Sequence, residues 1–488
     1  MMNKKLHKFY LITLLGILII FQPLNAQQSN TMYFMKGIPQ TQMYNPANQP
    51  KCNTFVGLPG ISNIGIDVAN NSLNLDKILH YYADSSFSVF ALNPYDGDPD
   101  AFMDNFGRKN YFSGLANINI LTFGFRKDDK YFTFGYRVKA SARLLYPTDF
   151  IRFPVKGIED GKEFDFSDFR ADLTAYQEFA LGISKQYDPY LSIGINTKVL
   201  FGLANFSQRK TDIGLTLNPL SAPCHVAFTQ NANIPFANIA YTNERIDSIY
   251  FDENPKTRDI VKHAFSNMGL GFDFGLNYNF DERLAISASI IDVGFIRWKS
   301  NPINIIQNAD YVIPGAHVIL SEVVDDSSTY DEQQIMDDFL DSLDNNLIIH
   351  QNKGNKYTTA LPTKIYLGGT YLVNKNMQIG LLSRTEFFKK KMYQQLTFST
   401  SFFPNSGFTP TFSYSLMNKS YFNLGFGLSV KVGWVNLYFV SDNIPVIFAE
   451  EVNDGYPVPH KTKSANFHFG MNLLFGCNKA FKDRPIVE

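Results

Sequence analysis

The chain has 488 residues, which is long for one ordinary soluble domain but normal for one large barrel. Its formal net charge of -1 excludes a global field that would attract nucleic acid, so no nucleic-acid partner is expected. Aromatic residues make up 15% and charged residues only 18% of the chain. Soluble proteins have about 25% charged residues, so this composition is aromatic-rich and charge-poor for that class.

The first 26 residues have the three parts of a secretory signal peptide. Lys4, Lys5 and Lys8 form a basic start, and the apolar run Phe9–Phe21 is too short to span a bilayer comfortably. Ala26 offers a small residue at the cleavage site, and no cysteine follows it for lipoprotein processing. A short membrane anchor is the alternative. No later stretch has the about 18 apolar residues of a membrane helix, so we expect a periplasmic protein, a secreted protein or an outer-membrane barrel.

Strict alternation of apolar and polar residues recurs along the chain and predicts strands with one apolar and one polar face. In the stretch Gly269–Ile290, every second residue from Leu270 to Phe280 is apolar or aromatic, and glycine, aspartate or asparagine stands between them. The same pattern begins at Phe132, Leu191, Leu424 and Phe467. A water-soluble sandwich and a membrane barrel both have this alternation, so it does not decide between them.

Connection lengths favour the barrel. Tight turns are predicted at Lys127–Lys130, Asp188–Pro189, Asp281–Arg283, Asn374–Asn376, Pro404–Gly407 and Val432–Gly433. Most connections between these hairpins are long: about 70–110, 147–173, 206–266, 299–360 and 443–463. Two are short, near Lys389–Lys391 and Asn418–Ser420. Short turns at one end and long loops at the other are typical of outer-membrane barrels.

We therefore predict an all-β transmembrane antiparallel barrel of about fourteen strands, an even number that closes with both termini in the periplasm. The apolar face then meets lipid, and the polar face lines the lumen. Trp298 and Trp434 lie at predicted strand ends, where they suit the lipid interface; ordinary turn packing is the alternative. The strands are predicted to begin near residues 54, 111, 131, 174, 190, 267, 284, 361, 377, 392, 408, 421, 434 and 464.

The segment before the first strand is rich in proline, asparagine and glutamine and has no strand period. It resembles the N-terminal hatch of FadL-like transporters, in which an Asn-Pro-Ala element precedes the first strand; here this is Asn45, Pro46 and Ala47. The whole chain resembles an uncharacterised FadL-like/PorP-like outer-membrane family of Bacteroidota. The residues that carry this resemblance are Tyr33–Met35, Asn45–Ala47, Gly57–Gly60, Gly271–Trp298 and Val440–Asn443. The resemblance implies a fourteen-stranded barrel plugged by the N-terminal segment.

Charged residues at inward positions of the strands are candidates for the lumen. They are Arg137, Lys139, Lys198, Asp273 and Lys431, and His468 also has a clear lumen position. Two roles are open. These groups form salt bridges that hold the hatch, because an unpaired buried charge is costly, or they line a polar conduit.

The chain has three cysteines. Cys52 precedes the first strand and Cys477 follows the last, and a closed barrel makes these strands neighbours. We therefore predict a disulfide between Cys52 and Cys477, with two free thiols as the alternative and Cys224 left unpaired in an outer loop.

Four outer segments are also assigned from their sequence. Asp96, Asp98 and Asp100 have the one-three-five spacing of a calcium loop but lack its later glycine and glutamate, so a solvated acidic loop is the main reading. Asp331–Asn346 and Ser72–Tyr82 are candidate helices that cover the barrel mouth or dock a surface partner. Phe387–Tyr393 is a basic tip suited to a solvated loop near lipopolysaccharide phosphate.

No enzyme motif occurs in the sequence, and we expect no catalytic activity, no cofactor and no metal. The predicted organisation is a signal peptide at 1–26, a hatch at 27–53, a barrel at 54–476 and a periplasmic tail at 477–488. In the cell outer membrane, the expected function is FadL-like passive transport of a hydrophobic or amphipathic small molecule. The alternatives are a non-transporting barrel partner of surface or secretion (type IX or gliding) machinery and, least favoured, an outer-membrane lipid enzyme.

Overall fold

A computed structural model gives the fold of residues 30–477. Within that range it describes every residue except 73–78, 82–87, 91–97, 157–162, 217–220, 234–236, 243–244, 252–255, 301, 315–350, 353–354, 390, 418–419, 443 and 445–463. The predicted signal peptide, the candidate helix at 331–346 and the tail beyond residue 477 lie outside the described residues. No helix in the described part of the chain is long and apolar enough to cross a membrane.

The chain forms a closed antiparallel barrel of fourteen strands, which confirms the predicted fold class. The first strand is interrupted and consists of β1 (Thr54–Gly57) and β2 (Ile64–Asn70), and the eighth consists of β17 (Tyr357–Ala360) and β18 (Thr363–Asn374). The other strands are β5 (Lys109–Lys127), β6 (Lys130–Pro147), β8 (Arg170–Gln186), β9 (Leu191–Thr216), β13 (Met268–Asn279), β14 (Leu284–Trp298), β19 (Met377–Phe388), β20 (Lys391–Phe402), β21 (Phe408–Met417), β22 (Ser420–Val432), β23 (Val435–Ser441) and β24 (Ser464–Phe475).

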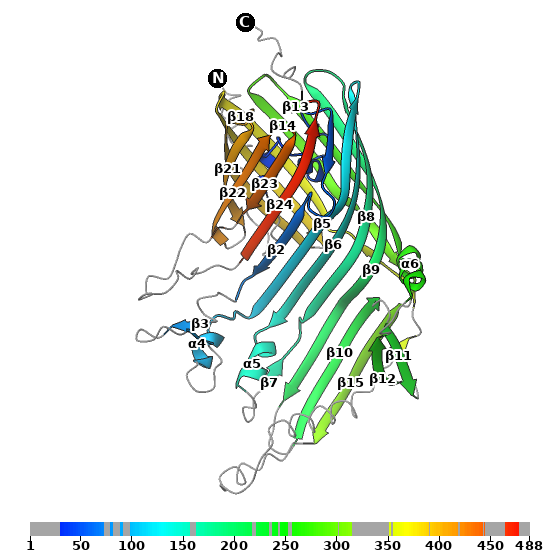
Figure 1. Ribbon diagram of the computed structural model, residues 1–488. Coiled ribbons are helices and arrows are strands. Elements are labelled where there is room, and N and C mark those ends of the chain that lie inside the picture. The colour runs from blue at the N-terminus through cyan, green and yellow to red at the C-terminus, as the bar shows by residue number, and fades with distance from the viewer. Residues whose placement is uncertain are drawn as a thin grey trace, which may run out of the picture.

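The last strand closes the barrel on the first. Thr54 of β1 pairs with Phe475 of β24, and β2 pairs with both β24 and β5. Six tight turns join consecutive strands at the end of the barrel that also holds the N-terminal segment (Figure 1). Three of these turns contain a residue with positive φ: Asp128 at 55°, Phe403 at 50° and Gly433 at 58°. The longer connections leave from the opposite end, as the connection lengths predict.

The outward face of the wall is apolar. Leu270, Phe274 and Phe280 of the β13 hairpin are 45%, 46% and 54% exposed. Their neighbours Asp273 and Gly275 are buried on the inward face. The sandwich reading is therefore wrong, because in a sandwich these aromatic side chains would be the buried ones.

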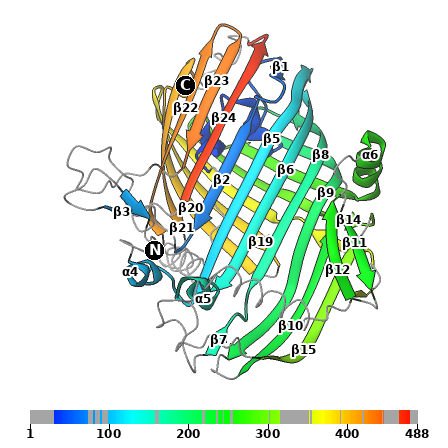
Figure 2. The ribbon, with the colours of Figure 1, turned by 60° about the horizontal axis from the view of Figure 1, so that its bottom comes forward.

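Part of the wall continues beyond the barrel. Strand β9 has 26 residues, and its outer half pairs with β10 (Ser221–Asn233), which in turn pairs with β15 (Ile303–Pro314). Figures 1 and 2 show this outer sheet projecting past the barrel at the end opposite the tight turns. The remaining outer elements are β3 (Leu79–Tyr81), β4 (Ser88–Phe90), α4 (Pro99–Met103), α5 (Asp149–Lys156), β7 (Glu163–Asp165), β11 (Ala237–Thr242), β12 (Arg245–Phe251), α6 (Thr257–Ser266) and β16 (Gln351–Asn352).

The candidate helix at Ser72–Tyr82 falls mostly on residues outside the described part of the chain, 73–78 and 82; its residues Leu79–Tyr81 form strand β3 and pair with β4. The expectation for Trp298 at a lipid interface is wrong. Trp298 is fully buried and not at a lipid interface, because Gly202 leaves space for its ring and its indole donates to Thr359 Oγ1 at 2.9 Å. Trp434 lies in a tight turn, is 57% exposed and stacks on Phe475.

Candidate functional site

The N-terminal segment at 30–53, here called the hatch, fills the lumen at the end with the tight turns. It contains the short helix α2 (Thr31–Phe34) and the 3-10 helix η1 (Pro39–Met43), and it lies inside the ring of strands (Figure 1). Its side chains meet the wall mainly through neutral hydrogen bonds. Tyr33 bonds Ser287 at 2.7 Å, and the amides of Gln40 and Asn472 bond each other reciprocally at 2.7 and 3.0 Å.

The Asn-Pro-Ala element is a docking point of the hatch on the wall. Asn45 Oδ1 accepts from the backbone N–H of Ala47 at 2.9 Å, and Asn45 Nδ2 donates to Asn277 Oδ1 at 2.9 Å. A Cβ at Gly275 would lie 2.1 Å from Asn45 Oδ1, so only glycine permits this approach. The inward glycines that contact hatch atoms in this way are Gly194, Gly275, Gly368, Gly380, Gly425 and Gly427.

Both ends of the hatch are tied to the wall. At its start, the Asp442 carboxylate accepts from the backbone N–H groups of Asn30 and Thr31, the latter at 3.1 Å. At its end, a disulfide joins Cys52 to Cys477 across 425 residues of sequence.

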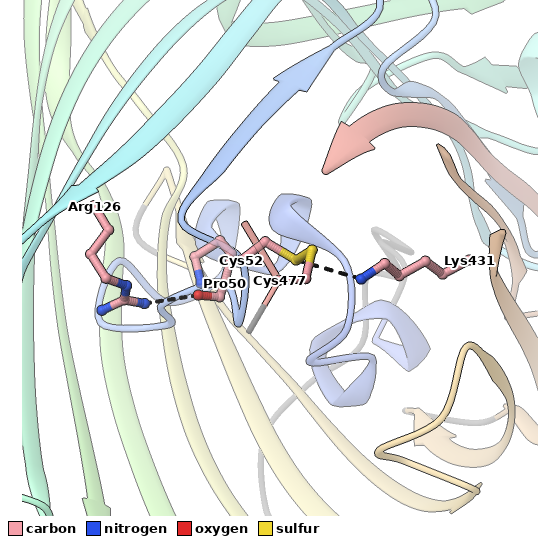
Figure 3. The surroundings of a disulfide bond; sticks show 5 residues. All are labelled: Pro50, Cys52, Arg126, Lys431 and Cys477. Carbon is pink, nitrogen blue, oxygen red and sulfur yellow. Dashed lines mark hydrogen bonds between the residues drawn. A yellow bond between two sulfur atoms is a disulfide. The ribbon is translucent and has the colours of Figure 1, made fainter. Parts of the chain in front are cut away.

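Two cations lie beside this disulfide (Figure 3). The Arg126 guanidinium donates to the Pro50 carbonyl at 2.9 Å. Lys431 Nζ lies 3.8 Å from Cys52 Sγ, so Lys431 meets the hatch and not the central lumen.

The interruption of the first strand is closed by hydrogen bonds. Leu58 N–H donates to Met471 O at 3.2 Å, and Gly60 N–H donates to Ile120 O at 3.0 Å. The inner side of the interruption touches the hatch, because Gln40 donates to Ser62 O at 2.9 Å. The wall is therefore continuous here, and one hatch side chain contacts its irregular segment.

A buried ionic cluster, here called the inner cluster, occupies the middle of the lumen wall. It contains the carboxylates Glu178, Asp273 and Asp292. Lys198 Nζ lies 2.6 Å from both Asp273 Oδ1 and Asp292 Oδ1. Arg137 and Lys139 bond the two oxygens of Glu178 at 2.6 and 2.7 Å, and Lys364 bonds Asp292 at 2.9 Å. Most of these pairs join neighbouring strands, and the Lys198–Asp292 pair reaches from β9 past β13 to β14.

A second group, here called the outer cluster, includes Arg143 at the outer end of the cavity and reaches the hatch through Gln395, whose Oε1 accepts from Asn30 Nδ2 at 3.0 Å. The Glu386 carboxylate pairs with both Arg143 and Arg384. Arg384 also donates to Gln395 Oε1 at 2.8 Å. The Arg143 guanidinium carbon lies 4.2 Å from the centre of the Phe388 ring, a cation–π geometry.

The predicted lumen residues divide into three places. Arg137, Lys139, Lys198 and Asp273 all lie in the inner cluster. His468 bonds Asp67 at 3.2 Å elsewhere on the lumen wall, and Lys431 lies by the disulfide. Except for Lys431, which contacts Cys52, these groups pair with charged residues of the wall and not with the hatch, whose 27–53 sequence contains no acidic residue.

Sequence reasoning missed most of the carboxylate partners. Glu178 and Glu386 stand at inward positions of their strands, so extending the alternation would have found them. Asp292 could not be found that way, because a β-bulge opposite Phe272–Phe274 turns both Ile291 and Asp292 inward. Asp292 has φ of 60°, an uncommon conformation for a non-glycine residue.

A cavity of about 120 Å³ lies in the lumen and extends from the hatch past both ionic clusters. Met43 and Tyr44 of the hatch border it at one end, and Arg143, Asp172 and Phe388 border it toward the outer end. Its charged lining residues are Arg137, Lys139, Arg143, Lys198, Lys364, Asp67, Asp172 and Asp292, together with His468.

The candidate calcium carboxylates have other partners. Asp98 accepts from Ala101 N–H at 2.9 Å and caps α4, and Asp100 pairs with Lys156. Asp96 lies outside the described residues. Among the residues that the structure describes, no group of three or more His, Cys, Asp or Glu side chains could hold a metal ion. In the basic tip, Lys389 pairs with Asp172.

Comparisons with known proteins add a family and a set of distant likenesses. A model described as a family of unknown function, DUF5723, matches residues 46–442. No curated protein matches the chain. The Ralstonia pickettii toluene transporter TbuX is 9% identical with a TM-score of 0.42, covering 90% of this chain and 94% of that one. A Pseudomonas aeruginosa FadL homologue is 10% identical with a TM-score of 0.42, covering 94% and 100%.

Proposed function

Because the chain belongs to DUF5723, a family of unknown function, we propose a function from its own geometry: an outer-membrane channel for passive entry of a small amphipathic molecule. The observation that carries the proposal is the lumen cavity, which reaches the hatch inside a closed barrel. The outward belt of phenylalanine, leucine and isoleucine suits hydrocarbon, and a closed barrel satisfies its backbone groups there.

The lining of the cavity supports an amphipathic solute over a purely hydrophobic one. Ionised side chains share the surface with Leu115, Ile291, Leu361 and Phe388. The volume of about 120 Å³ is similar to that of an engineered apolar cavity of about 150 Å³ that binds benzene. A solute of about one aromatic ring with one polar group therefore fits both the size and the chemistry of the cavity.

The hatch blocks the lumen at the periplasmic end. A solute can therefore pass only if the hatch moves away from part of the wall. Its contacts suit such movement. Most are neutral hydrogen bonds, and each contributes only about 0.5–1.5 kcal/mol when water can replace the partner. The disulfide at Cys52 would hold the end of the hatch at the seam of the barrel while the rest of the hatch moves.

A cross-link that pins the hatch tests this proposal. Thr31 Oγ1 and Ser413 Oγ are 2.6 Å apart, so the double variant Thr31→Cys with Ser413→Cys places two sulfurs at bonding distance across the hatch and the wall. The matched control is Ser401→Cys with Thr411→Cys, whose oxygens are 3.0 Å apart on two neighbouring wall strands. Proteoliposomes would be assayed for uptake of two membrane-impermeant amphipathic solutes, benzenesulfonate and phenyltrimethylammonium.

We expect the oxidised hatch cross-link to abolish uptake of whichever solute the wild type passes. The oxidised wall cross-link and each single cysteine variant should retain it. Wild-type uptake no faster than that of empty liposomes, or equal uptake by the two cross-linked proteins, would contradict the proposal.

A second candidate function is supported by the outer sheet. Strands β10 and β15 extend the wall beyond the barrel and present a surface that a channel does not require. In this alternative the barrel is a non-transporting partner of surface or secretion machinery. It predicts no solute uptake at all, together with loss of a surface partner when β10 and β15 are removed and β9 is shortened.

A further inference from the structure

We infer that the lumen cavity is a binding site for a compact organic anion with an apolar body. This inference deepens the proposed function, on which it rests for the route by which the anion arrives. It names the charge of the solute, which amphipathic character alone leaves open.

The polar surface open to the cavity comes mainly from cations. The side chains of Lys139, Arg143 and Arg137 keep 19%, 14% and 11% of their surface exposed. The carboxylates that they pair with are covered, since Glu178 and Glu386 are both 0% exposed. The pairing therefore hides negative charge behind the ammonium and guanidinium groups.

In both clusters the cations outnumber the carboxylates. The inner cluster has four cations (Arg137, Lys139, Lys198 and Lys364) for three carboxylates (Glu178, Asp273 and Asp292). The outer cluster has Arg143 and Arg384 for Glu386 alone. Each cluster therefore has one more cation than carboxylate. Within the clusters this local excess favours an anion in the cavity; over the whole lumen, the buried carboxylates Asp67 and Asp442 offset it.

Two other carboxylates border the cavity, and each has its own partner. Asp67 bonds His468 at 3.2 Å, and Asp172 pairs with Lys389. The Asp172 side chain is 13% exposed and lies toward the outer end of the cavity. Because Lys389 already pairs with Asp172, Arg143 and the inner cluster supply the cations that face the cavity.

The apolar residues of the lining indicate the size and character of the uncharged part of the ligand. Leu115, Ile291, Leu361 and Pro362 border the cavity together with the Phe388 ring. An inorganic anion would leave this apolar surface without a partner, and a long acyl chain exceeds a volume of about 120 Å³. A single-ring carboxylate or sulfonate satisfies both the charge and the size.

Equilibrium binding to the purified full-length protein in a non-ionic detergent tests the inference without any transport step. The probes are benzenesulfonate, its neutral analogue benzenesulfonamide, phenyltrimethylammonium and inorganic sulfate. We expect benzenesulfonate to bind at least about tenfold more tightly than each of the others, because a charge-assisted contact with a lysine or arginine is lost in the neutral analogue. Raising the salt concentration should weaken this binding.

Variants locate the site. Lys139→Gln and Arg143→Gln should each weaken benzenesulfonate binding about tenfold, whereas Lys139→Arg should retain it. The control is Lys185→Gln, since Lys185 pairs with Asp129 in an exposed turn region away from the cavity. If a glutamine variant fails to fold, the comparison of probes on the wild type still decides the charge of the ligand, and Lys139→Arg still reports on the site.

Equal binding of benzenesulfonate and benzenesulfonamide, tighter binding of the cation, or equal binding of sulfate would each overturn the inference. So would unchanged affinity in folded Lys139→Gln and Arg143→Gln variants. Binding without uptake in proteoliposomes would contradict the channel and leave the anion site standing. Uptake of phenyltrimethylammonium without benzenesulfonate binding would contradict the anion site and leave the channel standing.

Discussion

The two ends of the lumen are held together by different chemistry. At the hatch end, amides and hydroxyls of Gln40, Asn45 and Tyr33 bond neutral groups of the wall. At the middle and outer levels, lysines and arginines bond carboxylates across strands. Neutral bonds exchange with water at low cost, whereas a separated buried ion pair leaves an uncompensated charge. The difference indicates that the hatch can leave its seat, which is its position against the wall, whereas the charged wall stays fixed.

The sharpest test of the fixed wall is Lys198→Met. This lysine is 2% exposed and lies 2.6 Å from both Asp273 and Asp292, so its removal leaves two carboxylates with a missing partner. We expect the free energy of unfolding to fall by about 3–5 kcal/mol. Heat-dependent mobility on gels and circular dichroism would measure it. Lys185→Met is the control, and a loss no larger than in that control would contradict the fixed charged wall.

The seat of the hatch is tested by Gly275→Val. The added side chain would overlap Asn45 and Ala47, and such overpacking costs about 1–3 kcal/mol. We expect the hatch to leave its seat while the barrel remains folded, so that trypsin cleaves after Lys36 or Lys51 faster than in the wild type. Gly369→Val is matched, since a Cβ there meets no atom within 4 Å. Equal cleavage rates in the two variants would show that the hatch does not depend on this contact.

The disulfide should contribute less to global stability than either of these contacts. Strands β1 and β24 are already paired next to it, at Thr54 and Phe475. The double variant Cys52→Ser with Cys477→Ser should therefore lose free energy of unfolding at the low end of the about 0–5 kcal/mol range for disulfides. Its main effect should be faster proteolysis of the hatch. A large loss of barrel stability with an intact hatch would reverse this expectation.

The smallest effect is expected at a turn outside the lumen. Backbone N–H groups of Leu284 and Arg283 hold the pKa of Asp281 below its ordinary value. Asp281 therefore adds stability at pH values above its unfolded pKa, and this contribution is lost as pH falls through the lower folded pKa. The difference in stability between wild type and Asp281→Asn should be present at pH 7 and shrink below about pH 4. Thermal unfolding at several pH values measures it, with Glu282→Gln as the control; a difference independent of pH would refute it.

Much of the wall was predictable because its signals are local. Alternation identified the face of each strand, and the lengths of turns and loops identified the barrel. The seam between the first and last strands placed Cys52 beside Cys477, and a disulfide joins them in the structure. Each of these inferences needed only neighbouring residues and the rule that an antiparallel barrel closes on itself.

The interior was harder to predict, because its contacts depend on segments that are far apart in sequence. Asp292 faces inward only because of a bulge, and Trp298 is buried only because Gly202 makes room for it. The alternation places Gly275 on the lumen face, but it does not show that the hatch occupies the space beside this glycine. Alternation predicts whether a side chain points inward or outward, but it does not predict which distant residue that side chain contacts.

The bond between Cys52 and Cys477 makes the wall a covalent ring, because it spans 425 residues and encloses every strand. A single proteolytic cut anywhere between them leaves one molecule under oxidising conditions and two pieces only after reduction. A surface protease that nicks a long outer loop would therefore leave the barrel in one piece, with its ends still fastened side by side.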